Sequence, residues 1–386
     1  MDQTGVMLRR ALHTAPGERL ALFTWGAGVA GALGHGSEYN ERLPRRVEDL
    51  ALEAALSAAG SDCALACGLF HYAVRAGSRV FLFGRGAGGR LGLGDESSAT
   101  RPTELGGLAP VAGLALGGLH SVFLTRAGGL LAAGFGGWGA LGRGDYLAQH
   151  APAAVAGLPV VAHVAAGGAH TLAVDTAGGV WAWGRDEGEG RLGVASAART
   201  DGGSNVPLAV PLPAALAAPC TAAAGGGFHS LLLAGGGVLS FGGNANGELG
   251  RMGPSWKAAL VPGLPPIAHL AAGGFHSAAL TADGELYTWG HGGAGALGHG
   301  SRACERSPRR VGGPLEGVVI RAVACGGAST YVVTGEGAVW HWGKNQVSLG
   351  STSGDVLVPR QVAVPHRALA VAAGSAHAAL LCAVPG

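Results

Sequence analysis

Residues 273–311 read GGFHSAALTADGELYTWGHGGAGALGHGSRACERSPRRV. Two short apolar runs flank the dipeptide Asp283–Gly284, and this arrangement is a strong signal for a β-hairpin. The second run ends in Trp289–Gly290, after which a glycine-rich turn leads to Leu297–Gly298 and a polar loop. We therefore expect one antiparallel unit of short strands in this stretch.

Three markers of this unit recur along the chain. The first is an aromatic or small residue followed by Gly, the second is Leu-Gly, and the third is a His after a glycine-rich pair. The first marker falls at Trp25–Gly26, Phe83–Gly84, Ala133–Gly134, Trp183–Gly184, Phe241–Gly242, Trp289–Gly290 and Trp342–Gly343; the second at Leu33–Gly34, Leu91–Gly92, Leu141–Gly142, Leu192–Gly193, Leu249–Gly250, Leu297–Gly298 and Leu349–Gly350; the third at His71, His120, His170, His229, His276, His377 and, as a serine, Ser329. A period of about 50 residues with several short strands per unit is typical of a β-propeller blade.

The ends of the chain predict how the ring closes. The run that ends at Trp25 has no histidine run before it, and the run that follows His377 has no Trp-Gly run after it. Together they complete one blade, so that no sheet edge stays open. The sequence thus predicts an all-β, seven-bladed propeller whose N- and C-terminal strands share one blade, with residues 20–386 forming a single domain.

These markers resemble those of the regulator of chromosome condensation family of seven-bladed propellers. The resemblance covers about residues 20–383, and three markers at fixed offsets in seven copies make it specific. It implies the fold and several alternative functions, because members of the family are known as exchange factors for a small GTPase, chromatin binders, a plant ultraviolet sensor, and mitochondrial or cytosolic scaffolds. A fold that hosts so many roles does not choose among them.

Residues 1–19 precede the propeller. The segment that starts at Met7 is short, basic and rich in Ala and Leu, with Arg9 and Arg10, which is typical of a mitochondrial presequence cleaved near residues 15–17. The alternative is a plain N-terminal tail on a cytosolic protein. We also expect a short helix within the insertion at residues 48–66, and no transmembrane segment.

Catalytic and cofactor motifs are not supported by their context. G-x-G-x-x-G patterns occur in four units, but each is followed by Leu-Gly rather than by a helix, so we interpret them as turns. The histidines are spread around the ring, whereas metal ligands must converge. We expect their rings to bond backbone groups at strand ends. The sequence therefore predicts no enzyme, no cofactor and no metal.

Two stretches break the repeat and are candidate contact sites. The spacing between His170 and His229 is the longest of the chain, and its extra residues form an acidic loop that contains Asp186, Glu187 and Glu189. Long loops on a rigid scaffold commonly carry function. Trp256 lies on another loop, outside the Trp-Gly position, so it is either a partner anchor or a residue packed on its own blade.

Two similar segments carry arginine pairs. Residues 34–47 and 298–311 agree at ten of fourteen positions and contain Arg45–Arg46 and Arg309–Arg310. These pairs either form a basic face for phosphate, RNA or acidic proteins, or are solvated charges of similar repeats.

The preferred functional prediction is a non-catalytic scaffold that binds protein partners, a subunit or assembly factor of a larger complex, mitochondrial and with ribonucleoprotein or RNA contact. The resemblance implies a first alternative, a guanine-nucleotide exchange factor whose acidic loop residues perturb the Lys and Mg²⁺ of a small GTPase. Exchange factors of the family use a projecting wedge, which the sequence does not show. The second alternative is a structural component of a cytosolic or ciliary complex.

Overall fold

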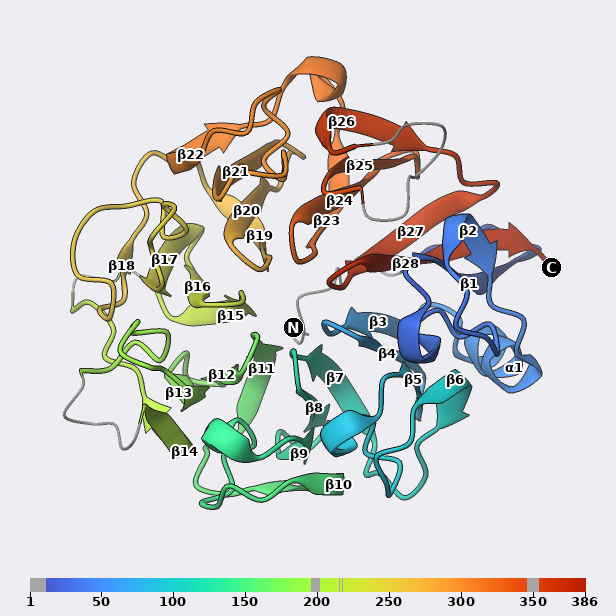
Figure 1. Ribbon diagram of the computed structural model, residues 1–386, viewed down its shortest axis with the longest axis horizontal. Helices are drawn as coiled ribbons and strands as arrows, with labels where there is room; N and C mark the ends of the chain where they lie inside the picture. Colours follow the sequence, from blue (N-terminus) through green and yellow to red (C-terminus); the bar gives the residue numbers. More distant parts are fainter. Residues whose placement is uncertain (1–11, 196–201, 215, 217, 346–353) are drawn as a thin grey trace.

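The computed structural model describes residues 12–195, 202–214, 216, 218–345 and 354–386. Seven four-stranded antiparallel sheets stand side by side in a closed ring (Figure 1), which confirms the predicted seven-bladed propeller. Within the described residues, no helix is long and apolar enough to cross a membrane.

Each blade runs outward from the axis through four strands. The inner strands are β3 (Cys63–Cys67), β7 (Val111–Leu116), β11 (Val161–Ala166), β15 (Cys220–Gly225), β19 (Ile267–Ala272), β23 (Ile320–Cys325) and β27 (Arg367–Ala373). The second strands are β4 (His71–Ala76), β8 (His120–Thr125), β12 (His170–Asp175), β16 (His229–Ala234), β20 (His276–Thr281), β24 (Ser329–Thr334) and β28 (His377–Pro385). The third strands are β5 (Arg79–Gly84), β9 (Leu130–Gly134), β13 (Val180–Arg185), β17 (Gly237–Gly242), β21 (Leu286–Gly290), β25 (Val339–Gly343) and β1 (Glu18–Gly26). The outer strands are β6 (Ala99–Glu104), β10 (Gln149–Val155), β14 (Gly203–Ala209), β18 (Ala259–Leu260), β22 (Glu305–Arg310), β26 (Val356–Val362) and β2 (Glu41–Arg46).

The two ends of the chain close the ring in one blade. Its strand order is β2-β1-β28-β27, so the outer half comes from the N-terminus and the inner half from the C-terminus. β1 pairs with β28 from Glu18↔Pro385 to Gly26↔His377 without a break in register. The predicted blade shared by the N- and C-terminal strands is thus confirmed.

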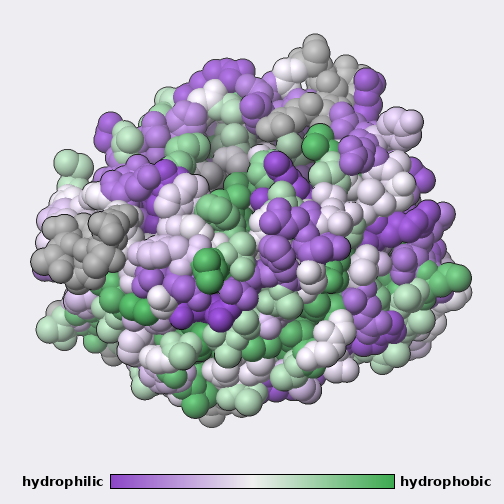
Figure 2. All heavy atoms as spheres, turned by 60° about the horizontal axis from the view of Figure 1, so that its bottom comes forward, coloured by the Kyte–Doolittle hydropathy of each residue, from purple (hydrophilic) through white to green (hydrophobic). Residues whose placement is uncertain are grey.

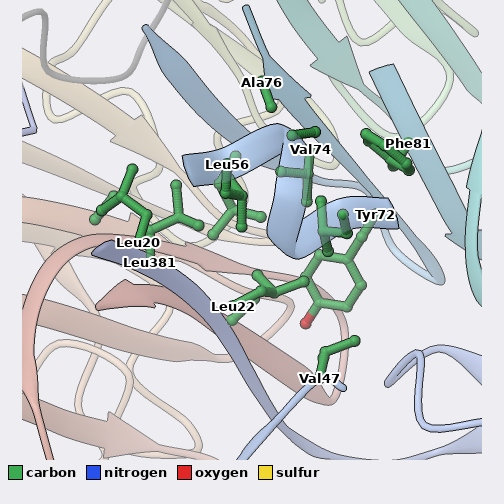
Figure 3. Close-up of a cluster of buried hydrophobic side chains, with 14 of the residues drawn as sticks. Leu20, Leu22, Val47, Leu56, Tyr72, Val74, Ala76, Phe81 and Leu381 are labelled. Carbon is green, nitrogen blue, oxygen red and sulfur yellow. The ribbon is translucent and has the colours of Figure 1, made fainter. Parts of the chain in front are cut away.

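The insertion between β2 and β3 forms the predicted helix, α1 (Leu50–Ala59). The Asp49 carboxylate accepts a hydrogen bond from the Leu52 amide at 2.9 Å, and Gly60 ends the helix at a φ of 54°. Leu52 and Leu56 enter a cluster of buried apolar side chains between the closing blade and the β3–β6 blade (Figure 3). The helix therefore covers the joint at which the ring closes.

The first residues of the proline-rich stretch that follows Asn205 belong to the outer strand β14, which pairs with β13 through Trp181↔Ala209 and Gly184↔Ser204. Proline is tolerated there because an outer strand needs only one of its two edges for pairing.

The histidine marker joins one blade to the next. In five blades the histidine Nε2 lies 2.8–2.9 Å from a Ser or Thr hydroxyl on the second strand of the following blade; the pairs are His71–Ser121, His120–Thr171, His170–Ser230, His229–Ser277 and His276–Thr330. The predicted backbone partners are wrong for these five rings, whereas Nε2 of His377 lies 3.0 Å from the backbone carbonyl oxygen of Leu69. A partner in the next blade was not visible in the sequence, because it lies about 50 residues away.

The same hydroxyl also binds the Leu-Gly marker. The Thr330 hydroxyl donates to the carbonyl of Ala296, which precedes Leu297, at 2.8 Å. The indole of Trp342 donates to the same carbonyl at 2.8 Å. The other four hydroxyls donate to the equivalent carbonyls, those of Arg90, Ala140, Arg191 and Glu248. The histidine and Leu-Gly markers therefore meet at five joints, and at three of these joints an indole of the first marker, that of Trp183, Trp289 or Trp342, binds the same carbonyl. We call this meeting point between neighbouring blades the latch.

The latch fixes the tautomer of the histidine. Because each hydroxyl donates its proton to a carbonyl, it must accept from the histidine, so Nε2 carries the hydrogen. The Nδ1 atoms of His71, His120, His170 and His229 are buried without a hydrogen-bond partner. The latch therefore requires a neutral imidazole.

Glycines bring the blades close enough for this contact. A Cβ at Gly226 would lie 2.4 Å from Cε1 of His229, and a Cβ at Gly118 would lie 2.4 Å from the Gly168 oxygen of the next blade. Next to the latches, a backbone hydrogen bond crosses each joint between blades, and together these bonds complete a circle. From amide donor to carbonyl acceptor, they run 69→117, 118→167, 168→226, 227→273, 274→326, 327→374 and 375→69. The glycine-rich pair before each histidine is thus a packing requirement of the ring.

The two exceptions to the latch occur at the two joints of the closing blade. At one joint Ser329 replaces the histidine. In the closing blade that follows, Ala378 occupies the position of the latch hydroxyl, so this joint has neither a histidine nor a hydroxyl. At the other joint Tyr72 replaces the Ser or Thr, and its hydroxyl lies 2.7 Å from Nδ1 of His377. At the first of these joints both partners of the latch change, whereas at the second the histidine stays and only the hydroxyl residue differs.

Acid should unfold the protein through these histidines. Burial lowers the pKa of His120, His276 and His377 to about 4 and that of His229 to about 3, against an ordinary value of 6.5. The unfolded chain binds more protons below pH 6.5, so stability is complete above that pH and is lost as the pH falls. Each of these histidines lowers the free energy of unfolding by about 2 kcal/mol at pH 5 relative to pH 7. Thermal unfolding followed by circular dichroism should show a steep fall in Tm between pH 6.5 and 5; an unchanged Tm over this range would contradict the latch.

Candidate interaction surface

The three markers lie on one face of the disc. The turn before His71 and the loop after Gly84 leave the sheet at the same end, because His71 pairs with Gly84 and Gly84 with Ala99. We call this side the marker face. It carries the turns that join the inner strand of each blade to the second strand, and the loops that join the third strand to the outer strand. α1 and the second-to-third hairpins lie on the opposite face. Figure 2 shows one side of the molecule, where hydrophilic and hydrophobic residues are interspersed.

The acidic loop on the marker face is organised around Asp186. This side chain is fully buried, and its carboxylate accepts hydrogen bonds from the amides of Gly188, Gly190 and Leu192 at 3.1–3.2 Å. The sequence predicted Asp186 as a partner contact, together with Glu187 and Glu189. In this structure Asp186 holds the loop together from inside, whereas Glu187 is exposed and Glu189 is half-exposed.

Two arginines attach this loop to the blades on either side. Arg185 forms an ion pair with Glu187, and its guanidinium lies 4.2 Å from the centre of the Trp138 ring in the preceding blade. Arg191 forms an ion pair with Glu189 at 2.6 Å and lies 4.8 Å from the Phe228 ring in the following blade. The loop RDEGEGR thus repeats one arrangement twice, an arginine between a glutamate and an aromatic ring.

Trp138 has an unusual backbone conformation. Its φ is +65°, a value that glycine adopts readily and other residues rarely. The same position of the β3–β6 blade holds Gly88, at φ +73°. Phe135 packs edge-on against the indole, with ring centres 5.3 Å apart. The equivalent residue of the closing blade, Ala30, also has a positive φ, +56°, so the backbone conformation belongs to the fold, and what distinguishes Trp138 is its large exposed side chain.

Trp256 lies beside the acidic loop. Its backbone packs so closely on Gly190 that a Cβ there would lie 2.4 Å from the Trp256 Cα. The Trp256 side chain is nevertheless exposed. The structure thus brings together two candidate stretches that lie far apart in the sequence, and the role of Trp256 as a partner anchor stays a prediction.

The arginine pairs lie elsewhere, on the outer strands β2 and β22, and carboxylates accompany them. Arg45 and Arg309 bind Glu41 and Glu305 of their own strands at 2.6 and 2.7 Å. Arg46 and Arg310 form their ion pairs as Arg46–Glu53, Arg310–Glu285 and Arg310–Glu316 at 2.8–3.0 Å. The predicted basic face stays a prediction, and its positive charge is largely compensated.

Sequence reasoning missed most of the aromatic residues on the marker face. Trp138 was visible as a tryptophan outside the Trp-Gly position, but nothing marked its contact with Arg185. Phe228 and Phe275 precede the histidines of neighbouring blades and stack with ring centres 5.0 Å apart. The residue directly before the marker histidine varies between units, and this variation was the one sequence signal that could have identified Phe228 and Phe275 as candidate surface residues.

The axis of the ring is a channel of about 550 Å³. It is lined mainly by Ala, Val and Leu from the inner strands, with Cys67, Cys325, His269 and Arg321 among the other side chains. Nowhere in the described chain do three or more His, Cys, Asp or Glu side chains gather as metal ligands would.

The fold and the latch define the class of protein: a closed seven-bladed propeller that displays its loops on a rigid disc. The family model of the RCC1-like domain matches residues 21–380, and the chain belongs to this family. RUG3, a mitochondrial RCC1 domain-containing protein of Arabidopsis thaliana, is 33% identical over 398 residues, which cover 94% of this chain and 88% of that protein.

Solved structures support the fold. Human WBSCR16 superposes with a TM-score of 0.80 at 21% identity, over 94% of this chain and 98% of that one. Prp20p of Saccharomyces cerevisiae, whose structure was described together with its binding properties to Gsp1p and histones, also gives 0.80, at 22% identity over 96% and 93% of the two chains. At these identities the likeness concerns the fold alone.

The strain at Trp138 can be measured with two variants. Trp138→Ala removes the indole and keeps a side chain at positive φ, whereas Trp138→Gly removes both the indole and the strain. We expect the glycine variant to be more stable than the alanine variant by about 1 kcal/mol, in urea unfolding at pH 7. Gly88→Ala, at the same position of another blade, should be destabilising for the same reason. An alanine variant as stable as the glycine variant would show that no strain is stored at this position.

Proposed function

We propose that this chain is a non-catalytic scaffold, a subunit or assembly factor of a larger mitochondrial complex that binds protein partners through the loops of the disc. The observation that carries the proposal is the 33% identity with a mitochondrial member of the family across 94% of the chain. Similarity over nearly the full length of both proteins supports a common architecture rather than one shared module.

The use of the titratable residues supports a non-catalytic role. The latch histidines are buried, neutral and bonded to the next blade, so they have no part in proton transfer to a ligand. The buried Asp186 serves its own loop. The polar residues that resemble catalytic groups in the sequence thus stabilise the scaffold.

The N-terminal segment supports the mitochondrial location, although residues 1–11 lie outside the described residues. Leu12 is buried in the cluster that contains Leu56 of α1, and Arg367 donates a hydrogen bond to the His13 carbonyl at 3.1 Å. We therefore favour an import signal that ends before Leu12. Cleavage near residues 15–17 would leave β1 intact but would remove a core side chain.

Contact with RNA or a ribonucleoprotein remains a prediction that rests on Arg45, Arg46, Arg309 and Arg310. Their carboxylate partners weaken the attraction that these residues would exert on phosphates. We therefore regard proteins as the principal partners.

Nucleotide exchange on a small GTPase is the second candidate function. The observation in its favour is that Glu187 and Glu189 present carboxylates on the marker face of a propeller whose fold is that of Prp20p. Such carboxylates would compete for the Lys and Mg²⁺ that hold the nucleotide of the partner. A cytosolic or ciliary structural role is the remaining alternative.

One experiment separates these functions. The full chain with a C-terminal tag is expressed in cells of its source, and the tagged protein is purified from mitochondrial and cytosolic fractions for mass spectrometry. We expect mitochondrial enrichment and a stoichiometric set of proteins of one complex. The matched control is the chain that begins at Leu12, which should stay in the cytosol. Recovery from the cytosol with a small GTPase would favour the second candidate, and recovery of the chain alone would contradict the scaffold.

A further inference from the structure

The charges of the acidic loop are unequally exposed. The Arg191 side chain is 1% exposed, while that of its partner Glu189 is 42% exposed. Arg185 is likewise less exposed than Glu187. The two guanidinium groups lie against aromatic rings, and the carboxylates face solvent. Although the loop contains both signs of charge, it therefore presents negative charge to a partner.

Three exposed aromatic side chains are connected to this loop through packing contacts. Trp138 is 40% exposed, Trp256 is 42% exposed and Phe275 is 43% exposed. They lie on three blades, and the loop with its carboxylates belongs to a fourth blade between them. In the described chain, Trp138 and Trp256 are the two tryptophans that are substantially exposed. Tryptophan at the surface is characteristic of residues that anchor protein partners.

A continuous series of contacts holds these residues in one rigid surface. Trp138 contacts Arg185, which binds Glu187, and Glu189 binds Arg191, which lies on Phe228. Phe228 stacks on Phe275, and Gly190 of the loop packs on the Trp256 backbone. We call the exposed members Trp138, Glu187, Glu189, Trp256 and Phe275 the aromatic–acidic patch. A pre-organised patch binds with little loss of conformational entropy.

The loop itself shows which chemistry this surface accepts. Each of its arginines is held by a carboxylate on one side and an aromatic face on the other. An incoming Arg or Lys side chain would find the same two kinds of group on the exposed side of the patch, while an incoming phosphate or carboxylate would meet Glu187 and Glu189. Apolar side chains beside the cation would pack on the exposed rings.

We propose that the aromatic–acidic patch docks a protein segment that carries arginine or lysine side chains between apolar ones. This proposal rests on the scaffold function proposed above and adds the surface and the chemistry of the partner. Basic proteins are thus recognised at the marker face, and the outer-strand arginines take no part in this contact.

A defined peptide tests this proposal on the purified full chain. The probe is a fluorescein-labelled peptide of repeated Arg-Leu-Gly-Ser units, and the same peptide with Glu for Arg is its control. We expect saturable binding of the arginine peptide by fluorescence anisotropy at physiological salt, and none of the glutamate peptide. A double substitution, Glu187→Gln with Glu189→Gln, should weaken the binding about tenfold or more, as should Trp138→Gly. The glycine variant keeps a backbone that its position favours, so loss of binding is not loss of folding.

The matched control variant is Glu96→Gln. Glu96 is an exposed carboxylate on a third-to-outer loop of the marker face, paired with His150 at 3.3 Å and outside the patch. Its substitution should leave the affinity unchanged. Equal affinity of the wild type, the double variant and Trp138→Gly for the arginine peptide would overturn the proposal. Saturable binding of fluorescein-labelled polyuridylate by the wild type, weakened in the double variant and in Trp138→Gly, would also overturn it, because the patch would then bind RNA.

The same variants distinguish this proposal from the scaffold function. If the tagged wild-type chain recovers no complex, the scaffold function fails whatever the peptide does. If the wild type recovers a complex and the patch variants recover the same proteins in the same amounts, the scaffold function stands and the patch proposal is wrong.

Discussion

The fold depends on one contact that crosses from each blade to the next. A histidine and a backbone carbonyl of one blade enclose a hydroxyl of the following blade, as His276 and Ala296 enclose Thr330. Both polar groups are buried, and each would cost free energy if it were left without a partner. The contact forms only if the blades approach closely, so it requires glycine at the positions where a Cβ would clash. It also requires a neutral histidine, because Nδ1 of histidines such as His229 is buried without a hydrogen-bond partner.

The sequence could predict the fold because this contact repeats. Its histidine, and the Leu-Gly pair that follows its carbonyl, are two of the three markers that recur along the chain, so the number of blades and the closure by β1 and β28 follow from counting. The partner of each histidine was beyond prediction, because it belongs to another unit and its identity depends on how the blades face each other. The paired change of Ser329 and Ala378 was present in the sequence, but it has meaning only once the latch is known.

The candidate site was less predictable for a related reason. Asp186, Glu187 and Glu189 were found as residues of one loop, but their roles differ because Asp186 points into the loop. The contact between Arg185 and Trp138 joins two blades, and no spacing rule announces it. The pair Arg309–Arg310 was predicted as part of a basic face without regard to Glu305, which lies four residues earlier on the same strand, shares its face and binds Arg309. Contacts between repeats thus set the limit of what the sequence predicts.

The propeller is a single cooperative unit that depends on its latches and on the shared blade. Native-state hydrogen exchange tests this most directly. If the account is right, the amides of β28, which pairs with β1, should exchange with the same free energy as those of β8, β12 and β16, and only by global unfolding. Exchange of the β1 and β28 amides at a much lower free energy, while the other second strands stay protected, would show that the ring opens at its closing blade and would contradict the central claim.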